Sequence, residues 1–319
     1  MKFYRLARGF LRVRQGNFRS YDPSAPFLPD PVVFSGLRVS FSIAKSLSWT
    51  TNTCTVKIWN MSQEKRNLIK DYGDELTLYA GYREEGGAQI LFTGDTTAVS
   101  HVYDQPEIVT ILECGDGDKY LNQIRVSLSY ASGVPARRII KELADQMGIQ
   151  FVEFAESENL VYRLGFRYIG MAKDALTILC DKLGLQASVQ NNQLQVIPKN
   201  GSIEESVFEI NENTGMQGVP QRFTYRSLDL YRQVFGSPAD NPNFAPTAPT
   251  IPISRPIGYK VNVALNPLIL PGSRIILTSR HLGLSPAPFS VVAVRHEGDN
   301  YGQVWSTQLE VVEVINNNV

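Results

Sequence analysis

The stretch from Gly258 to Asn300 constrains the fold most, because its strands follow one another too closely for helices to intervene. Residues 259–265 alternate apolar and polar side chains, which is typical of a half-buried strand. Further strands are predicted at 273–279, 288–296 and 304–314. Parallel neighbours need a crossover of about a dozen residues or more. We therefore expect an antiparallel meander.

The turns of this meander have recognisable chemistry. Pro271-Gly272 suits the centre of a type II turn, since proline presets φ and glycine accepts a positive φ. Glu297-Gly298-Asp299-Asn300 is predicted to turn the chain into the last strand, with Gly298-Asp299 as turn residues. Nothing in the stretch has a catalytic pattern, which favours a structural role.

The first 119 residues are also predicted to be mostly β. A half-buried strand at 36–44 is expected to pair with a strand at 53–59. Ser62 is a suitable N-cap for a short helix through Lys70, with Leu68 and Ile69 covering the end of a barrel. Strand patterns follow at 74–82, 88–94, 96–103 and 108–114. Short strands separated by turn signals indicate a small barrel or sandwich.

The pattern changes between residues 120 and 199. Apolar residues at helical spacing predict helices at 135–147 and 174–183, ended by Gly148 and Gly184. Each helix and glycine precedes a strand, which makes a weak repeat of about 36 residues. Asn191-Asn192 is a plausible hairpin turn. We expect a small inserted α/β module.

The linker before this module, Gly115-Asp-Gly-Asp118, resembles a calcium loop. It lacks the third ligand position, the central glycine and the distal glutamate of an EF-hand, so a hinge is the better interpretation.

From residue 200 the chain is predicted to be β again, as far as residue 319. Residues 237–256 contain six prolines and should form an exposed excursion with polyproline II character. This loop is interpreted as a surface feature or as an arm that grips a neighbour. The predicted fold is α+β and mainly β, with β-rich domains at 1–119 and 200–319 that flank the α/β module at 120–199.

Composition excludes several functions. The 31 basic and 31 acidic residues balance, whereas nucleic-acid binding needs a basic surface. Cys54, Cys114 and Cys180 lie in separate apolar runs and are expected to be buried, reduced thiols. No run approaches the ~20 apolar residues of a membrane span, and the basic N-terminus lacks the apolar core of a secretory signal. We expect a soluble protein made in the cytoplasm.

Motifs for chemistry are equally sparse. The chain has three histidines, none spaced for a zinc site, and no GxSxG, Walker or GxGxxG pattern. Asp95, Glu113 and Asp116 are explained as strand-end or turn residues, although paired carboxylates far apart in the chain could form a glycosidase. We expect no catalytic residue, metal or cofactor. A sugar-stacking aromatic platform remains an alternative.

The N-terminal 21 residues are strongly basic. Arg5, Arg8 and Arg12 are interpreted either as a solvated strand face or as a rim that pairs with acidic groups of a neighbouring subunit. A chain with much β structure, no net charge and no chemistry most often works by assembling.

Five segments, in order along the chain, resemble the baseplate hub (tail hub) proteins of contractile-tailed bacteriophages, of the late-control protein D type. These segments are 36–62, 130–136, 170–179, 213–220 and 261–307. The motif positions that carry the resemblance are Asn60, Met61, Ser62, Thr214, Gly215, Met216, Gly218, Pro220, Asn266, Pro267, Pro271, Gly272, His296, Gly298 and Asp299. Met61 and Met216 stand where leucine is usual, which is a tolerated exchange.

This resemblance implies a homotrimeric ring in which each copy contributes two tube-like β-barrels. Such a ring adapts the six-fold tail tube to the three-fold central spike and lets double-stranded DNA pass through its lumen. The implied partners are the tail tube protein, the central spike protein, other baseplate proteins and the tape measure protein. The implied location is the virion baseplate, after assembly in the host cytoplasm and without membrane insertion.

Three alternatives stay open. The chain could be a cell-wall-degrading enzyme of the tail tip, a receptor-binding tail protein, or the hub of a related contractile injection machine. We expect any peptidoglycan-cleaving enzyme to lie on another chain.

Overall fold

The computed structural model describes residues 4–15, 26–47, 51–69, 72–83, 87–116, 124–152, 161–198, 203–224 and 257–314. The described residues are mainly in antiparallel strands, which confirms the predicted mainly β fold class. The proline-rich loop predicted at 237–256 lies outside the described residues.

Seven strands form the N-terminal half. They are β1 (Arg5–Arg12), β2 (Val32–Ser35), β3 (Val39–Ser46), β4 (Asn52–Trp59), β5 (Glu75–Tyr82), β6 (Gly87–Asp104) and β7 (Glu107–Asp116). They pair in the order β3-β4-β7-β6-β5-β1-β2. The predicted pairing of the first two strands is confirmed, with Phe41 opposite Val56. The strands predicted at 88–94 and 96–103 are one long strand, because the chain passes between them through a bulge at Thr96/Ala98 rather than a turn.

The short helix α1 (Gln63–Leu68) is capped by Ser62, whose Oγ accepts a hydrogen bond from Lys65 N at 3.5 Å. The helix ends at Leu68 because Ile69 takes an extended conformation. Ile69 is buried as predicted, but Leu68 is 47% exposed. The prediction that Leu68 covers the core was therefore wrong.

Six strands form the C-terminal half. They are β15 (Ile203–Ile210), β16 (Met216–Thr224), β17 (Ile257–Ala264), β18 (Ser273–Ser279), β19 (Leu284–Asp299) and β20 (Trp305–Glu313). β18, β19 and β20 form the predicted meander. β17 instead pairs with β16 and β20. Its place in the meander was predicted wrongly because alternation does not specify which strands pair.

Two turn predictions have different outcomes. Gly272 has φ +91°, and Ser273 N donates to Leu270 O at 3.0 Å, as a type II turn at Pro271-Gly272 requires. Gly298 is not a turn residue, because it still pairs with Trp305 in β20. Asp299 opens the turn, since its carbonyl accepts a hydrogen bond from Gly302 N at 3.2 Å.

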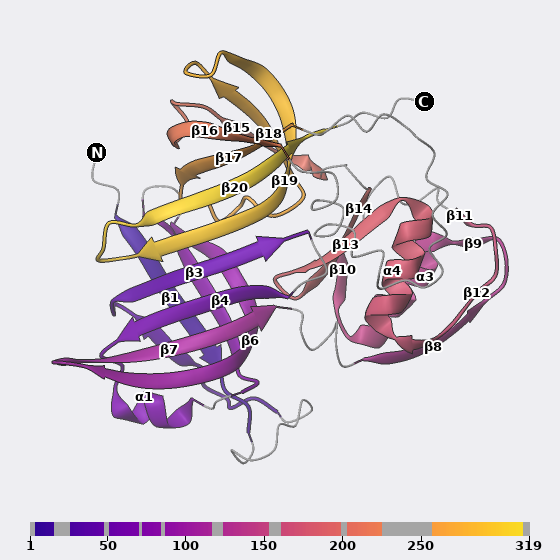
Figure 1. The fold of residues 1–319 in the computed structure, drawn as a ribbon. Coiled ribbons are helices and arrows are strands. Elements are labelled where there is room, and N and C mark those ends of the chain that lie inside the picture. The colour runs from indigo at the N-terminus through magenta and orange to yellow at the C-terminus, as the bar shows by residue number, and fades with distance from the viewer. Residues whose placement is uncertain are drawn as a thin grey trace.

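The two halves join where β19 pairs with β3, and the result is one sheet of 13 strands (Figure 1). In order, its main path runs β16-β17-β20-β19-β3-β4-β7-β6-β5-β1-β2. No closed barrel is detected among the described strands, so the expected pair of barrels is not confirmed. Each half still has its own hydrophobic core, and Trp305 of β20 extends into the N-terminal one.

The middle module lies beside the sheet (Figure 1). Its helices α3 (Ala136–Met147) and α4 (Ala172–Leu183) end at Gly148 and Gly184, whose φ values are +69° and +68°. Strands follow both glycines, so the predicted tandem plan is confirmed. The module's strands are β8 (Arg125–Tyr130), β9 (Val134–Pro135), β10 (Gln150–Val152), β11 (Val161–Tyr162), β12 (Phe166–Met171), β13 (Leu185–Gln190) and β14 (Gln193–Pro198).

All three cysteines are buried and free, as predicted. Burial raises the pKa of the Cys54 and Cys114 thiols, which keeps both protonated. No helix within the described ranges is long and apolar enough to span a bilayer.

Candidate functional site

The described residues contain no group of three or more His, Cys, Asp or Glu side chains arranged to hold a metal ion. Two polar junctions dominate the structure instead. We define the seam as the contact of β19 with β3, and the latch as the contact of the β13–β14 turn with the ends of β3, β4 and β7. Both hold together parts that are far apart in the sequence.

The centre of the seam depends on Gly298, one of the predicted motif positions. Gly298 lies opposite Phe41, whose ring meets Trp305 edge-on with 5.4 Å between centroids. A Cβ at Gly298 would lie 2.4 Å from Phe41 Cζ and 2.8 Å from Trp305 Cε3. Both aromatic side chains are buried, so neither has free space to move into. The glycine allows the two halves to approach closely.

Gly298→Ala is expected to lower the free energy of unfolding by about 1–3 kcal/mol, because the added methyl overpacks the seam. Denaturant unfolding measures the change, with Glu297→Ala as a control on the neighbouring half-exposed side chain. A stability within about 0.5 kcal/mol of the parent protein would show that the rings adjust freely.

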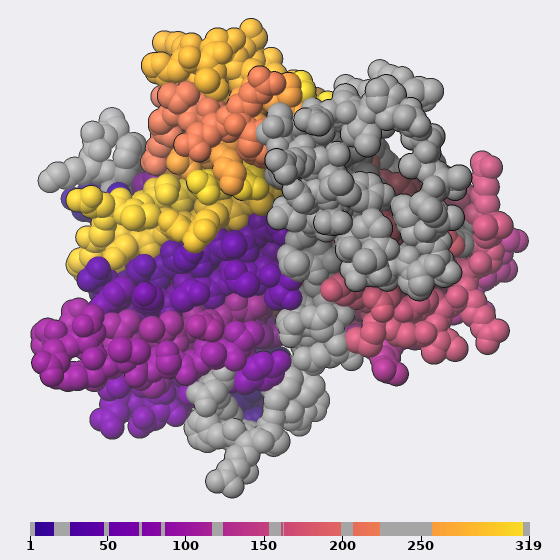
Figure 2. Space-filling view, viewed as in Figure 1, coloured from indigo at the N-terminus to yellow at the C-terminus, as the bar shows by residue number. Residues whose placement is uncertain are grey.

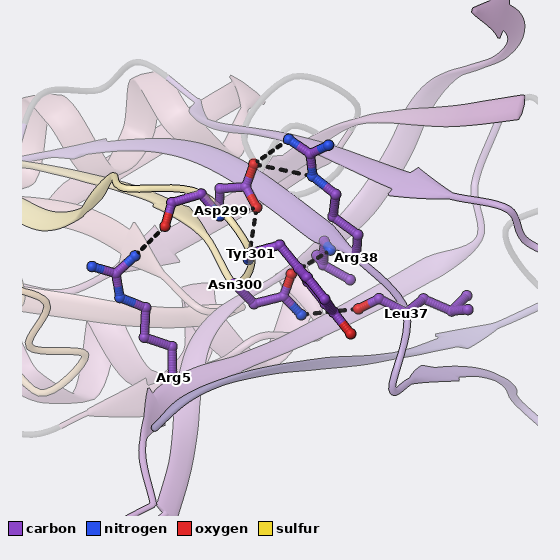
Figure 3. Close-up of polar contacts among 8 residues, drawn as sticks. Arg5, Leu37, Arg38, Asp299, Asn300 and Tyr301 are labelled. Carbon is purple, nitrogen blue, oxygen red and sulfur yellow. Dashed lines mark hydrogen bonds and ion pairs between the residues drawn. The ribbon is translucent and has the colours of Figure 1, made fainter. Parts of the chain in front are cut away.

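The turn after β19 clamps the start of β3 (Figure 3). Asn300 Oδ1 accepts a hydrogen bond from Val39 N at 2.8 Å, and Asn300 Nδ2 donates to Leu37 O at 2.9 Å. Asp299 Oδ2 lies 2.9 Å from the Arg38 guanidinium. The Arg38 hydrogen bond and those from Tyr301 N and Gly302 N lower the pKa of Asp299, against an opposing effect of its partial burial. The side chains of Asp299 and Asn300 therefore accept hydrogen bonds from one arginine and three backbone N–H groups, which hold this turn in one geometry.

Asn300→Ala is expected to cost about 1–3 kcal/mol of unfolding free energy, because it leaves a half-buried N–H and C=O without partners. Asn262→Ala is the control, since Asn262 is exposed on β17. Thermal or denaturant unfolding compares the two. Equal losses would show that the clamp contributes nothing specific.

The three N-terminal arginines that were predicted at a subunit rim all have contacts within the chain. Arg5 donates to Gly302 O at 2.6 Å and Gln303 O at 3.1 Å, which ties β1 to the β19–β20 turn. Arg8 stacks on a tyrosine of β5. Arg12 forms a 3.0 Å ion pair with a glutamate of β5, and its side chain is 54% exposed. Arg5 therefore acts inside the chain, while the exposed Arg8 and Arg12 remain candidates for the rim.

The latch is built around Asp116, at the end of β7. Its carboxylate accepts hydrogen bonds from Asn191 N at 2.6 Å and Asn192 N at 2.9 Å, the two central residues of the β13–β14 turn. Both asparagines have positive φ, 52° and 60°, as predicted for a two-residue hairpin turn. Asn52 Nδ2 adds a third donor at 3.3 Å. The predicted hinge is therefore a buried attachment point at Asp116.

Lys45 completes the latch from β3. It is buried, and its Nζ donates to Asn191 Oδ1 at 2.6 Å. Burial lowers the pKa of Lys45 to about 8, with Asp116 acting in the opposite direction. Burial likewise raises the pKa of Asp116, while the turn amides and Lys45 favour its charged form. Asn52 Nδ2 donates to Val189 O, and the side chains of Gln186 and Gln190 donate to backbone carbonyls at the end of β3.

His296 is the one buried histidine among the described residues, at the seam opposite Ile43. Its Nδ1 lies 2.9 Å from Thr307 Oγ1, and Nε2 has no hydrogen-bond partner there. Burial, together with the charge of Lys45, lowers the pKa of His296 to about 3. The imidazole is therefore neutral near pH 7.

The remaining motif positions lie at strand ends. Asn60 has φ +56° after β4, and Met61 is buried in the N-terminal core. Gly215 has φ +95° and its carbonyl accepts from Ala264 N at 2.8 Å. Asn266 Oδ1 accepts from Leu268 N at 3.0 Å. Thr214 lies before β16 and Met216 begins it, Gly218 and Pro220 lie in the register shift between Gln217 and Gln221, and Pro267 lies beyond β17.

Sequence reasoning missed the roles of Lys45, Asn52 and Asp116 in the latch. Asp116 was assigned to a strand end or to the hinge, and no local signal indicates that it is buried together with Lys45. The sequence indicated the Asn191-Asn192 turn, but Asp116, the acceptor of its hydrogen bonds, lies 75 residues from Asn191.

A family model described as "Baseplate hub gp41" matches residues 24–225, which is more than half of the chain. A search of curated proteins found no match.

The structure is similar to a tail protein from Neisseria meningitidis MC58, at a TM-score of 0.61, 13% identity and 96% coverage of both chains. It is also similar to the 43 kDa tail protein of prophage MuSo2 from Shewanella oneidensis, at a TM-score of 0.60, 12% identity and coverages of 96% and 98%. It is also similar to the E. coli c3393 protein, a component of the type VI secretion system, at a TM-score of 0.53 and 11% identity. The match covers 88% of this chain and 74% of the c3393 chain. At these identities the likeness shows a shared fold.

Proposed function

This chain belongs to the baseplate hub gp41 family, with a structural role in a phage tail baseplate, and from that premise we propose that three copies form the ring at the hub. The ring adapts the six-fold tail tube to a three-fold central spike and lets the genome pass. It is a shape-matching function that needs no reaction. The absence of a metal-ligand cluster from the described residues is compatible with it.

One observation carries this proposal. Both halves of the chain consist of strands in a single hydrogen-bonded sheet, and the seam holds the halves side by side. Three copies then present six β halves around one axis, which is how a three-fold assembly can meet a six-fold one. We propose that each half closes into a tube-like domain within that ring, with the domains at 1–119 and 200–319.

The sheet face along the seam suits the wall of a channel for DNA. Two open hollows of 420 and 320 Å³ lie on it. Two of its cations are paired: Lys260 lies 2.7 Å from Glu310, and Arg295 lies 2.8 Å from Glu297, while Lys57 lines the second hollow. Paired cations give DNA little net attraction, so a strand can slide past without being held.

The middle module at 120–199 is proposed to lie outside the ring or toward the spike, since its helices do not continue the sheet. The proposed partners are the tail tube protein, the central spike protein, other baseplate proteins and the tape measure protein. Assembly is proposed to take place in the host cytoplasm.

The mass of the purified chain in solution tests the proposal. Light scattering is expected to give three times the 35.6 kDa chain mass, and the tube and spike proteins should bind opposite faces of that trimer. A stable dimer, or a trimer that binds neither protein, would contradict the proposed function.

A tail-tip enzyme or a receptor-binding protein gives different results. Zymography on peptidoglycan detects cell-wall cleavage, and a pull-down on host cells detects receptor binding. We expect both assays to be negative for this chain. Clear lysis would replace the structural proposal with the enzymatic one. Gene neighbours distinguish a phage hub from the hub of an injection machine.

A further inference from the structure

The two halves of the sheet repeat one strand order. Strands β3, β4, β7, β6, β5 and β1 pair in sequence in the N-terminal half, and β16, β17, β20, β19, β18 and β15 pair in the same sequence in the C-terminal half. The last pair differs in direction, since β1 is antiparallel to β5 and β15 is parallel to β18. The chain visits the corresponding strands in the same order. β6 thus corresponds to β19, and β3 corresponds to β16.

The correspondence extends to side chains. Ala98-Val-Ser-His-Val-Tyr-Asp104 in β6 matches Ala293-Val-Arg-His-Glu-Gly-Asp299 in β19 at four of seven positions. His101 Nδ1 lies 3.1 Å from Thr110 Oγ1, just as His296 lies 2.9 Å from Thr307 Oγ1. β6 and β19 also carry a bulge at equivalent places, just before Ala98 and Ala293. The similarity therefore reaches the pairing register.

Beyond the bulge the two strands differ in one respect. From Ala293, β19 leaves β18 and pairs with β3, which forms the seam. From Ala98, β6 has left β5 and pairs with β7 alone among the described strands. The hairpin of β6 and β7 projects from the body (Figure 1), and Tyr103 is 65% exposed. This part of β6 has the form of a seam strand whose partner is missing.

The composition of this part of β6 does not prevent its free edge from pairing with another strand. Residues 97–104 contain no lysine, arginine, proline or glycine, and Asp104 is their one charge. Long β-prone edges without such residues pair with other strands. β16, the counterpart of β3, is an end strand of the sheet, and among the described strands it pairs with β17 alone (Figure 1). One chain thus carries both halves of a second seam, and Figure 2 shows them in separate places, with the β6–β7 hairpin in magenta at the lower left and β16 in orange near the top.

We infer that β6 of one copy pairs with β16 of the next copy, so that each contact between subunits repeats the seam within the chain. The contact joins different surfaces of the two copies, so it is heterologous and propagates until a ring closes. This inference rests on the proposed ring and names the strands that form it.

The internal seam supplies the register. In the chain, His296 faces Ile43 and Glu297 faces Ser42. Those β3 residues correspond to Arg222 and Gln221 of β16, since both sets occupy equivalent places against β4 and β17. His101 should therefore face Arg222 of the next copy, and Val102 should face Gln221. Val102 is 45% exposed in the single chain, and Gln221 is exposed as well.

Cysteine cross-linking tests this register. Side chains directly opposite in an antiparallel pair have Cβ atoms ~5 Å apart. The variant V102C/Q221C, treated with a short bis-maleimide, is expected to give covalent dimers and trimers on a denaturing gel. V102C/Q308C is the matched control, because Gln308 lies on β20 with strands on both sides. The three native cysteines are buried, which keeps the background low.

A charge exchange gives a second readout in case the cysteine variants fold poorly. V102K/Q221K places like charges opposite each other and should raise the concentration at which half the chains are trimeric by several-fold. V102K/Q221E should restore the parent value. Light scattering over a dilution series measures both.

The outcomes separate this inference from the proposed function. A trimer that neither cross-links at this register nor responds to the charges overturns the strand pairing and leaves the ring intact. Dimers from V102C alone would show that β6 pairs with itself, which also overturns it. A chain that stays monomeric at every concentration and never cross-links contradicts the ring and the pairing together.

Discussion

Replacing Asp116 with alanine is expected to lower the free energy of unfolding by about 3–5 kcal/mol, one of the two largest effects of a single change in this protein. The substitution leaves two turn amides, at Asn191 and Asn192, without their acceptor. It also leaves the buried Lys45 ammonium without the nearby negative charge. Removing one member of a buried charged network costs far more than removing an exposed charge.

Denaturant unfolding measures the loss, and hydrogen exchange locates it. The amides of Asn191 and Asn192 should lose protection in D116A, because the carboxylate is what they bond to. D145A is the matched control, since Asp145 is exposed on α3. A loss below about 1 kcal/mol, or unchanged exchange at the turn, would show that the latch does not hold the module.

Acid is expected to destabilise the protein through His296, by up to ~1.4 kcal/mol for each pH unit. The folded-state pKa is about 3 and the unfolded value is about 6.5. Between those values the unfolded chain binds more protons, so the free energy of unfolding falls as the pH decreases. The stabilisation is complete above about pH 6.5 and disappears toward pH 3.

The variant H296Q isolates this effect. Both proteins contain the same carboxylates, so the contribution of these groups to the pH dependence cancels when the two slopes are subtracted. Unfolding free energies from pH 7 to pH 4 should fall less steeply in H296Q. H281Q removes the same group from an exposed turn and serves as the control. Identical slopes in H296Q and the parent protein would mean that the imidazole is solvated.

Local patterns predicted much of what was found. Alternation located β3, β4 and β18, and helical spacing with a following glycine located α3 and α4. These signals work because they are local. The half-burial of a strand and the left-handed residue that ends a helix both depend on neighbours within a few positions. The boundaries failed where a bulge replaced a turn, at Thr96, and where a strand continued through Gly298 and Asp299.

The likeness of β6 to β19 is present in the sequence but is short. Four matches in seven residues are too few to stand out alone. They gain weight because the strand order, the bulge and the histidine–threonine contact agree with them.

The sequence by itself determined the kinds of element, their order and the turn at Pro271-Gly272, since each follows from the preferences of adjacent residues. Only the tertiary structure decided that β19 joins β3, and that Asp116 and Lys45 are buried against one turn. Tertiary contacts in this chain link residues as far apart as Arg5 and Gln303, separated by 298 positions. Strand edges expose the same backbone groups whatever their side chains, so pairing is selected by the packing of the whole sheet.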